Sequence, residues 1–152
     1  KKKMTKEFID YYSINIANKS KPLKGVVNFL TWAKNNNISM AVCTNKQEHL
    51  AVKLLKQLNL FKFFDFIAGA NTFAYNKPDA RHLTDVVEII GGDLKKTLMV
   101  GDSEVDAKSA ENAKLPFILV KDGYTNKLNN QIKHNELIDD FVELEKIVKK
   151  YL

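Results

Sequence analysis

Two carboxylates stand four residues apart directly after an apolar run. The stretch LMVGDSEVDAKSAENA places Asp102 and Asp106 behind the run Leu98–Gly101. Carboxylate oxygens are hard ligands that suit Mg²⁺, which proteins usually bind through one or two carboxylates, with water and phosphate completing the coordination. The spacing therefore indicates magnesium chemistry at the end of a buried strand.

A second group of polar residues follows the same logic. Thr44 and Asn45 close another apolar run, ISMAVCT, and Lys77 lies in a loop ahead of Pro78. A hydroxyl group and the backbone amides at a helix N-terminus can bind phosphate oxygens, and a lysine adds a point charge. Together with the acidic pair, these residues predict one site: Thr44, Asn45 and Lys77 bind phosphate, and the two aspartates ligate Mg²⁺.

Each residue also has a plainer interpretation when it is taken alone. Thr44 could cap the next helix, Lys77 could be an exposed loop lysine, and Asp102 could be the N-cap of a helix that leaves Asp106 exposed. What favours the combined site is that each residue stands at the end of a strand or in a loop. The three histidines share no metal-ligand spacing, which favours structural or surface roles for them; they are His49, His82 and His134.

The elements that must position these residues alternate between strand and helix. Apolar runs typical of strands buried on both faces occur at Ile38–Thr44, Phe64–Gly69, Thr97–Gly101 and Phe117–Val120, with a shorter one at Glu136–Asp139. Helical spacing of apolar residues predicts helices at Thr5–Asn18, Val26–Asn37, Gln47–Leu58, Asp79–Ile90, Glu104–Lys114 and Val142–Leu152. The alternation predicts an α/β, doubly wound, Rossmann-like domain with a mostly parallel sheet. In such sheets, ligands bind outside the carboxyl ends of the strands.

Length, charge and cysteine content restrict the class of protein. The 152 residues fit one domain with a sizeable core, and no apolar run approaches the roughly 20 residues that span a bilayer. The net charge of +6 comes from scattered lysines without a zinc-binding spacing or an RNA-binding signature, so we expect no nucleic-acid and no membrane partner. A single cysteine, Cys43, and the lack of a visible signal sequence favour a cytoplasmic protein.

The motifs AVCTN, NKPDARHL and MVGDSEVDAKSA together resemble the later motifs of the haloacid dehalogenase superfamily: a strand ending in Ser or Thr, a downstream loop lysine and an acidic motif. Within it, the chain is most similar to the bacterial phosphoglycolate phosphatases, through PLKGVVNFL and GGDLKKTLMVGDSEVDAKSAENAKLPFILVKDGYT. The resemblance covers essentially the whole chain. FIDYYSINIANKSKPLKGV resembles the last helix of that family's small helical cap. Residues 1–20 are therefore expected to be a cap remnant, and residues 21–152 the haloacid dehalogenase-like (HAD-like) core.

The resemblance implies a role for each matched residue. Thr44 would hydrogen-bond the transferring phosphoryl group, with Asn45 beside it, and Lys77 would neutralise charge on that group. Asp102 would ligate Mg²⁺, and Asp106 would support the metal or pair with Lys77. Phosphoryl transfer needs mainly positioning and charge neutralisation. The implied activity is Mg²⁺-dependent hydrolysis of a small phosphorylated acid, 2-phosphoglycolate, to glycolate and phosphate, with Thr44 and Lys77 as catalytic residues.

The family's nucleophile motif, Asp-x-Asp-Gly-Thr after an apolar strand, does not occur in these residues. Asp10, in FIDYYS, falls in the predicted helix and is no substitute. Because no phosphoaspartyl intermediate forms without the nucleophile, we expect the chain by itself to be inactive.

The resemblance also places the missing strand at the centre of the sheet, between the strand ending at Thr44 and the one ending at Gly101. An empty central position would leave two unpaired strand edges facing each other. We expect it to be closed by direct pairing, by a segment from a second copy in a homodimer, or by a complementing N-terminal segment.

Two other function classes remain. A non-catalytic remnant or interaction module could keep this fold after losing its nucleophile. A phosphorylation-receiver domain also uses Asp, Thr and Lys, but there the acidic residues come first and the lysine last. The order here is Thr44, Lys77, Asp102, which favours the phosphatase-type site over the receiver.

Overall fold

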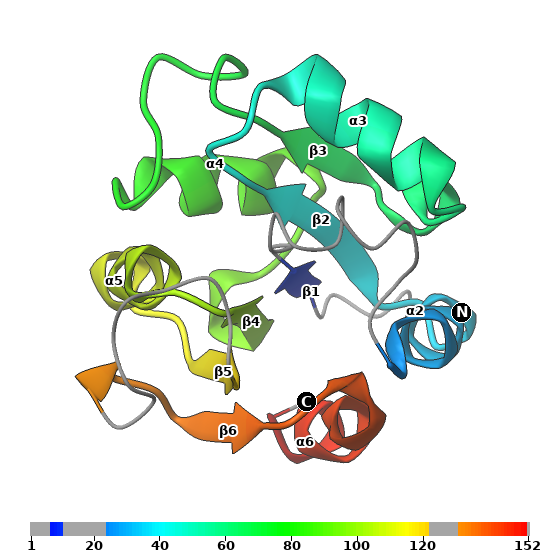
Figure 1. Ribbon diagram of the computed structural model, residues 1–152. Coiled ribbons are helices and arrows are strands. Elements are labelled where there is room, and N and C mark those ends of the chain that lie inside the picture. The colour runs from blue at the N-terminus through cyan, green and yellow to red at the C-terminus, as the bar shows by residue number, and fades with distance from the viewer. Residues whose placement is uncertain (1–6, 11–23, 122–130, 152) are drawn as a thin grey trace.

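The computed structural model describes residues 7–10, 24–121 and 131–151. Within these ranges, six parallel strands form one sheet in the order β3-β2-β1-β4-β5-β6 (Figure 1). The strands are β1 (Glu7–Asp10), β2 (Ser39–Cys43), β3 (Phe66–Ala68), β4 (Thr97–Gly101), β5 (Phe117–Val120) and β6 (Glu136–Ile138). The direction in which successive strands are added reverses between β1 and β4, as in a doubly wound sheet. The predicted α/β class is confirmed.

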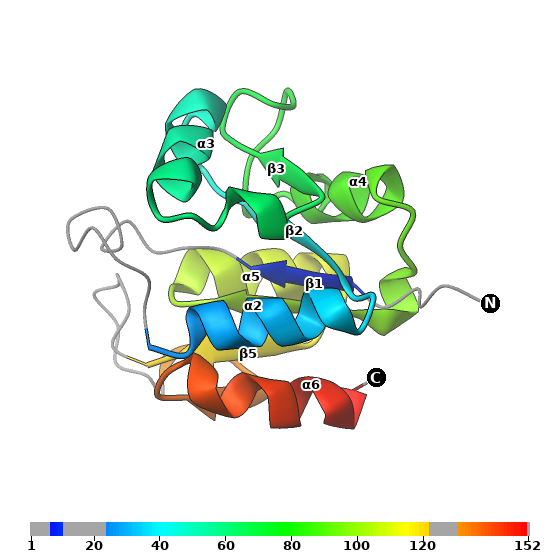
Figure 2. The ribbon, with the colours of Figure 1, turned by 90° about the vertical axis from the view of Figure 1, so that its right-hand side faces the viewer.

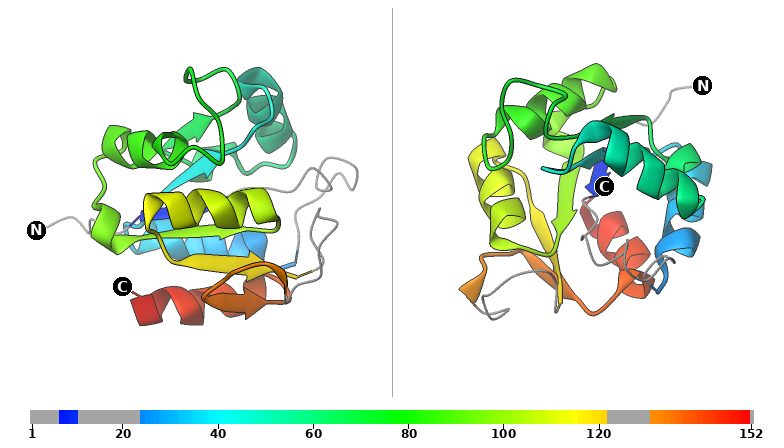
Figure 3. Two further views of the ribbon diagram at one scale, coloured as in Figure 1. Left: turned by 90° about the vertical axis from the view of Figure 1, so that its left-hand side faces the viewer. Right: turned by 45° about the horizontal axis from the view of Figure 1, so that its top comes forward.

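Helices cover both faces of the sheet. On one face lie α2 (Val26–Asn35), α3 (Glu48–Gln57) and α6 (Leu144–Tyr151), which Figure 2 shows in front. On the other face lie α4 (Arg81–Ile89) and α5 (Glu104–Ala113), which are in front in the left view of Figure 3. Every helix and strand predicted from residue 26 onward is present, with ends that differ by a few residues. Short 3-10 turns occur at Phe61–Phe63, Leu94–Lys96 and Phe141–Glu143. Among the described residues, no helix is long and apolar enough to cross a membrane.

Alternate residues along the strands belong to two separate cores. In β2, Met40 and Val42 pack with the α2, α3 and α6 layer, whereas Ala41 and Cys43 pack with α4 and α5. Successive side chains of a strand point to opposite faces. Because helices cover both faces, both sets of side chains are apolar, which is why these strands appear in the sequence as unbroken apolar runs.

The centre of the sheet differs from the prediction. Residues 7–10, which apolar spacing placed in a helix over Thr5–Asn18, form β1 between β2 and β4. Asp10 stands in register with Val42 on one side and Val100 on the other. The helix prediction is therefore wrong for these four residues. The expectation of an empty central position is also wrong, because the chain's own β1 occupies it.

The reason for this difference is tertiary. A short apolar segment such as Phe8–Ile9 is compatible with a helix or with a buried strand, and its spacing alone does not separate the two. A strand between β2 and β4 satisfies two backbone edges at once, and β1 pairs with both neighbours along its whole length. Apart from residues 7–10, the predicted cap remnant at residues 1–20 lies outside the described residues.

Deletion of residues 1–10 is expected to speed amide hydrogen exchange in both β2 and β4, because each strand loses a hydrogen-bonded neighbour. A backbone hydrogen bond contributes about 1 kcal/mol net, so exchange should quicken by roughly fivefold to tenfold at the affected amides. The measurement is hydrogen exchange followed by NMR, with β6, which does not pair with β1, as the internal reference. Unchanged protection in β2 and β4 would show that residues 7–10 do not belong to the sheet.

Candidate active site

The predicted site residues lie where the sheet order reverses. Asp10 ends β1, and Thr44 and Asp102 each stand two residues beyond the positions that pair with it in β2 and β4. Parallel strands end at a common edge, so the residues after β2 and β4 flank the end of β1. This is the place where open α/β sheets bind ligands.

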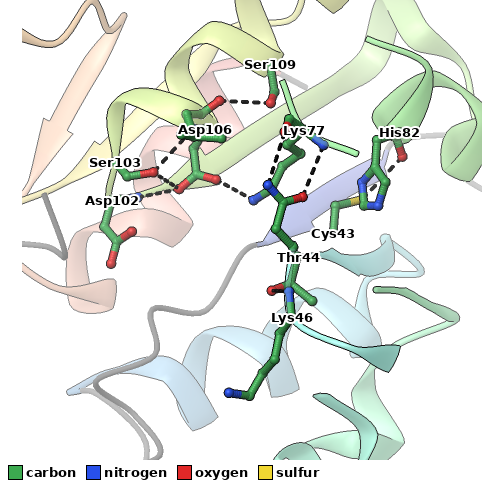
Figure 4. A network of polar contacts seen from close by, with 11 residues as sticks. Cys43, Thr44, Lys46, Lys77, His82, Asp102, Ser103, Asp106 and Ser109 are labelled. Carbon is green, nitrogen blue, oxygen red and sulfur yellow. Dashed lines mark hydrogen bonds and ion pairs between the residues drawn. The ribbon is translucent and has the colours of Figure 1, made fainter. Parts of the chain in front are cut away.

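A buried ion pair joins two of the predicted residues. Lys77 Nζ lies 2.5 Å from Asp106 Oδ1, and the two side chains are 2% and 0% exposed. Figure 4 shows Lys77 reaching from the loop before α4 to the first turn of α5. A charge can be buried when a partner compensates it, so each side chain allows the other to stay inside. The interpretation of Lys77 as an exposed loop lysine is therefore wrong.

The second oxygen of Asp106 is engaged by the start of α5. Oδ2 accepts hydrogen bonds from the Asp102 backbone amide and the Ser103 hydroxyl, both at 3.1 Å. Ser103 is the N-cap of the helix, and its Oγ accepts from the Asp106 amide at 3.3 Å, so the serine hydroxyl binds both the backbone and the carboxylate of Asp106. The interpretation of Asp102 as the N-cap, with Asp106 exposed, is wrong. Of the two roles the resemblance implies for Asp106, the structure shows the pairing with Lys77; direct metal ligation stays a prediction.

Gly101 is needed because Asp106 packs against it. A Cβ atom built on Gly101 would lie 2.5 Å from both Cβ and Oδ2 of Asp106, closer than side-chain atoms approach. Any larger residue here would push the carboxylate away from Lys77. The glycine in the motif MVGDS is thus explained by the close approach of the α5 carboxylate to the end of β4.

Asn45 holds the backbone of Lys77. Its Nδ2 donates to the Lys77 carbonyl at 3.0 Å, and its Oδ1 accepts from the Lys77 amide at 3.1 Å. Since a backbone carbonyl only accepts and a backbone N–H only donates, this pairing fixes which way the Asn45 amide points. The predicted contact of Asn45 with phosphate is not tested by this geometry. The contact that the structure does show ties the strand-end turn to the Lys77 loop.

Thr44 is placed to donate to an anion. It is 4% exposed, its amide donates to the Ala68 carbonyl at 2.9 Å, and its Oγ1 accepts from the Lys46 amide at 3.1 Å. The N-cap of α3 is Gln47, so the interpretation of Thr44 as the helix cap is wrong. Thr44 Oγ1 thus accepts a hydrogen bond from Lys46, and no described residue accepts the hydrogen of the Thr44 hydroxyl. The hydroxyl can therefore donate to a phosphoryl oxygen.

Asp102 supplies the carboxylate that fits a magnesium ion. It is 5% exposed, and Figure 4 shows its carboxylate pointing away from Asp106 and Lys77. In the described part of the chain, no group of three or more His, Cys, Asp or Glu side chains could hold a metal ion. This donor set does not fit a zinc or calcium cage built from protein ligands. It fits the coordination usual for Mg²⁺, in which one carboxylate acts together with water and substrate phosphate.

Cys43 and His82 lie behind these residues. Burial raises the pKa of the Cys43 thiol to about 12, so it stays a neutral thiol, consistent with a packing role. His82 is fully buried, and its Nε2 lies 3.2 Å from the Gly69 carbonyl. The sequence motifs contain His82 but gave it no role in the site. Only the folded chain shows that it lies against the two loops that carry Thr44 and Lys77.

This edge of the sheet has three characteristic features: Thr44 at a strand end, a loop lysine paired with an acidic residue, and a further aspartate after β4. The family model of the haloacid dehalogenase-like hydrolases matches residues 1–120. The chain belongs to this family.

Curated relatives of this chain carry a more specific name. The phosphoglycolate phosphatase of Agrobacterium fabrum is 41% identical over 148 residues, which cover 94% of this chain and 64% of the relative. That of Mesorhizobium japonicum is 38% identical over 139 residues, which cover 91% of this chain and 61% of the relative. The chain thus spans less than two thirds of the length of these relatives.

Solved structures agree on the fold. A predicted phosphoglycolate phosphatase from Haemophilus somnus has a TM-score of 0.78 at 26% identity, covering 82% of this chain and 56% of that one. The core domain of a putative phosphoglycolate phosphatase from Streptococcus pneumoniae has a TM-score of 0.72 at 20% identity and covers 96% of both chains. At 20% identity, the second similarity concerns the fold alone.

Replacement of Lys77 by Met is expected to lower the free energy of unfolding by about 3–5 kcal/mol, because the Asp106 carboxylate is left buried without its cation. Adding Asp106→Asn removes that charge while keeping an acceptor for Ser103. The double variant should therefore be more stable than the sum of the single effects, by about 1 kcal/mol or more. The measurement is urea unfolding of the three variants and the parent chain.

The matched control is the exposed pair Lys108–Glu111, whose side chains are 59% and 45% exposed. Lys108→Met should change the free energy of unfolding by at most about 1 kcal/mol. Additive effects of Lys77→Met and Asp106→Asn would contradict the pairing seen in the structure.

Proposed function

We propose that this chain forms the phosphate- and magnesium-binding part of a Mg²⁺-dependent phosphomonoester hydrolase of the phosphoglycolate phosphatase type. The observation that carries the proposal is the buried Lys77–Asp106 pair, set between the ends of β2 and β4. A structural ion pair has no need to lie at the reversal point of a parallel sheet, whereas a phosphate-binding lysine does.

Each residue contributes positioning or charge. The Thr44 hydroxyl donates to a phosphoryl oxygen. The Lys77 ammonium has three donor hydrogens, one of which goes to Asp106, and its charge offsets the negative charge of the phosphoryl group. Bound Mg²⁺ would supply further charge neutralisation and orientation, held through the Asp102 carboxylate. Phosphoryl transfer depends mainly on these effects.

We propose 2-phosphoglycolate as the substrate, hydrolysed with one water to glycolate and phosphate. The support is the name shared by the relatives from Agrobacterium fabrum and Mesorhizobium japonicum, at 41% and 38% identity. The net charge of +6 is compatible with attraction of a small anionic acid. We place the reaction in the cytoplasm, because the single cysteine, Cys43, is a buried free thiol and reduced thiols are typical of that compartment.

We propose that the attacking carboxylate is absent from these 152 residues and that the chain alone is inactive. The sequence has no Asp-x-Asp-Gly-Thr motif, so the nucleophile would come from a complementing N-terminal segment or from a second copy in a homodimer. Asp10 is the alternative that the fold adds, because its backbone ends the central strand beside β2 and β4. Substitution of Asp10 separates the two sources.

A second candidate function is a non-catalytic remnant or interaction module. The observation in its favour is the missing nucleophile motif. The two candidates differ in ligand binding, because a remnant has no need of a working phosphate and magnesium site. Binding therefore discriminates between them even where turnover is absent.

The first experiment is titration of the chain with inorganic phosphate and Mg²⁺, followed through the NMR signals of the Thr44 and Lys77 amides. Both amides are expected to shift with saturable binding. Asp102→Asn should remove the Mg²⁺-dependent part, because the metal loses its carboxylate ligand, whereas Asp139→Asn, an exposed aspartate paired with Lys121, serves as the control. No binding of either ion would favour the remnant.

The second experiment is a phosphate-release assay with 2-phosphoglycolate and Mg²⁺. The chain alone is expected to show no turnover. Activity is expected after addition of a separately expressed segment that covers the unmatched part of the Agrobacterium fabrum relative, and Asp102→Asn should abolish it. Turnover by the chain alone that disappears in Asp10→Asn would overturn the proposal of an external nucleophile and assign the attack to Asp10.

A further inference from the structure

His82 is the buried polar side chain behind the site that the proposed chemistry does not use. It is 0% exposed on the first turn of α4, and its ring meets the Phe73 ring edge-on, with centroids 5.7 Å apart. Its Nε2 lies 3.2 Å from the Gly69 carbonyl. Nδ1 has no hydrogen-bond partner among the described residues.

The hydrogen bond fixes the chemical state of the ring. A carbonyl oxygen only accepts, so the Nε2 of His82 must carry the hydrogen. A proton on Nδ1 as well would create a buried cation with no acceptor, in a protein interior that already holds the Lys77 ammonium. The structure therefore requires a neutral ring protonated on Nε2. If packing alone were required, an aromatic ring without nitrogens would fill this space and avoid the cost of the unpaired Nδ1.

Gly69 is the point at which two loops meet. A Cβ built on Gly69 would lie 2.4 Å from the Glu48 nitrogen and 2.7 Å from the Lys46 carbonyl oxygen, so its backbone lies directly on the turn that follows Thr44. The next amide, that of Ala70, donates to the same Lys46 carbonyl at 2.7 Å. The chain then continues from Gly69 through the loop that carries Lys77 to α4.

His82 also touches the end of β2. Its backbone carbonyl accepts from the Cys43 thiol at 3.8 Å, and Cys43 precedes Thr44 directly. Figure 4 shows the His82 ring beside Cys43. One residue thus contacts both the strand end that presents Thr44 and the loop start that leads to Lys77.

We infer that His82 is a positioning residue: its Nε2–H holds the Gly69 carbonyl and thereby fixes the loop that brings Lys77 to Asp106 and to a phosphate bound at Thr44. The expected effect on phosphate binding rests on the proposed function. The expected effect on the position of Lys77 does not. His82 touches no substrate and acts through the loop.

The electrostatic surroundings agree with a neutral ring. Burial lowers the pKa of His82, the bond to Gly69 and the Asp79 carboxylate act in the opposite direction, and the Lys77 ammonium lowers the pKa further. The folded pKa thus lies below the unfolded value of about 6.5. His82 therefore contributes stability that is present above about pH 6.5 and is lost as the pH falls towards the folded pKa.

Two variants separate the hydrogen bond from the ring. His82→Gln keeps an N–H donor at the reach of Nε2 but loses the ring, whereas His82→Phe keeps the ring and loses the donor. The Lys77 amide, which donates to Asn45, reports the loop without any ligand. We expect its hydrogen exchange to quicken roughly fivefold or more in His82→Phe, the effect of losing about one hydrogen bond, and to stay near the parent value in His82→Gln.

The phosphate titration supplies the functional readout. Affinity for inorganic phosphate with Mg²⁺ should fall by about tenfold in His82→Phe and by much less in His82→Gln, since only the former releases the loop. His134 is the matched control: its Nδ1 lies 2.7 Å from the Ile132 carbonyl, in a segment remote from Lys77 in the sequence. His134→Phe should leave both the Lys77 amide exchange and the phosphate affinity unchanged.

Several outcomes would overturn the inference. One is a wild-type ring protonated on Nδ1 in a long-range ¹H–¹⁵N spectrum, which needs no variant to fold. Another is an unchanged Lys77 amide in His82→Phe, and a third is an equal loss in His82→Gln and His82→Phe. The lowered pKa of His82 has a separate test: a pH dependence of stability that is the same in His82→Phe as in the parent chain would contradict it. If the parent chain binds no phosphate, the proposed function fails, while the Lys77 exchange still decides the role of His82.

Discussion

The buried pairing of Lys77 with Asp106 is the interaction on which the rest of the site depends. Both groups are almost completely removed from water, and neither could stay there alone at an acceptable free-energy cost. The neighbouring residues are arranged around this requirement. Gly101 leaves room for the carboxylate, Ser103 binds its second oxygen, and Asn45 holds the backbone from which the lysine extends.

The parallel sheet makes such a pairing possible because it brings distant segments to one edge. β2 and β4 are separated by more than fifty residues in the chain, yet they flank the same central strand, so Thr44 and Asp102 lie on either side of its end. The two helical layers shield the strands on both faces. Polar groups are then concentrated at the strand ends, which the two helical layers do not occupy.

The loops behind the site are cross-linked by hydrogen bonds. Gly69 contacts the turn after Thr44, Thr72 accepts from the Gly69 amide and donates to Glu48, and His82 binds the Gly69 carbonyl. These contacts restrict the loop that carries Lys77 without touching the place where a phosphate would bind. Phosphoryl transfer gains mainly from fixed positions of charged and donor groups, and a cross-linked loop is a direct way to provide them.

Much of this could be predicted from the sequence. Local spacing of residues determines the periodicity of strands and helices from residue 26 onward. It also determines the motifs around Thr44, Lys77 and Asp102, so both can be recognised in the sequence alone. The exposed or capping interpretations of single residues could not be excluded in this way, because burial of Lys77 depends on Asp106, which lies twenty-nine residues away. The sequence by itself therefore determined the fold class and the family, and it predicted which residues form the candidate site. Only the tertiary structure decided that residues 7–10 fill the centre of the sheet, that Asp106 pairs with Lys77, and that Asn45 and His82 hold the loop. Each of these depends on contacts between segments far apart in the chain, and no local pattern encodes them.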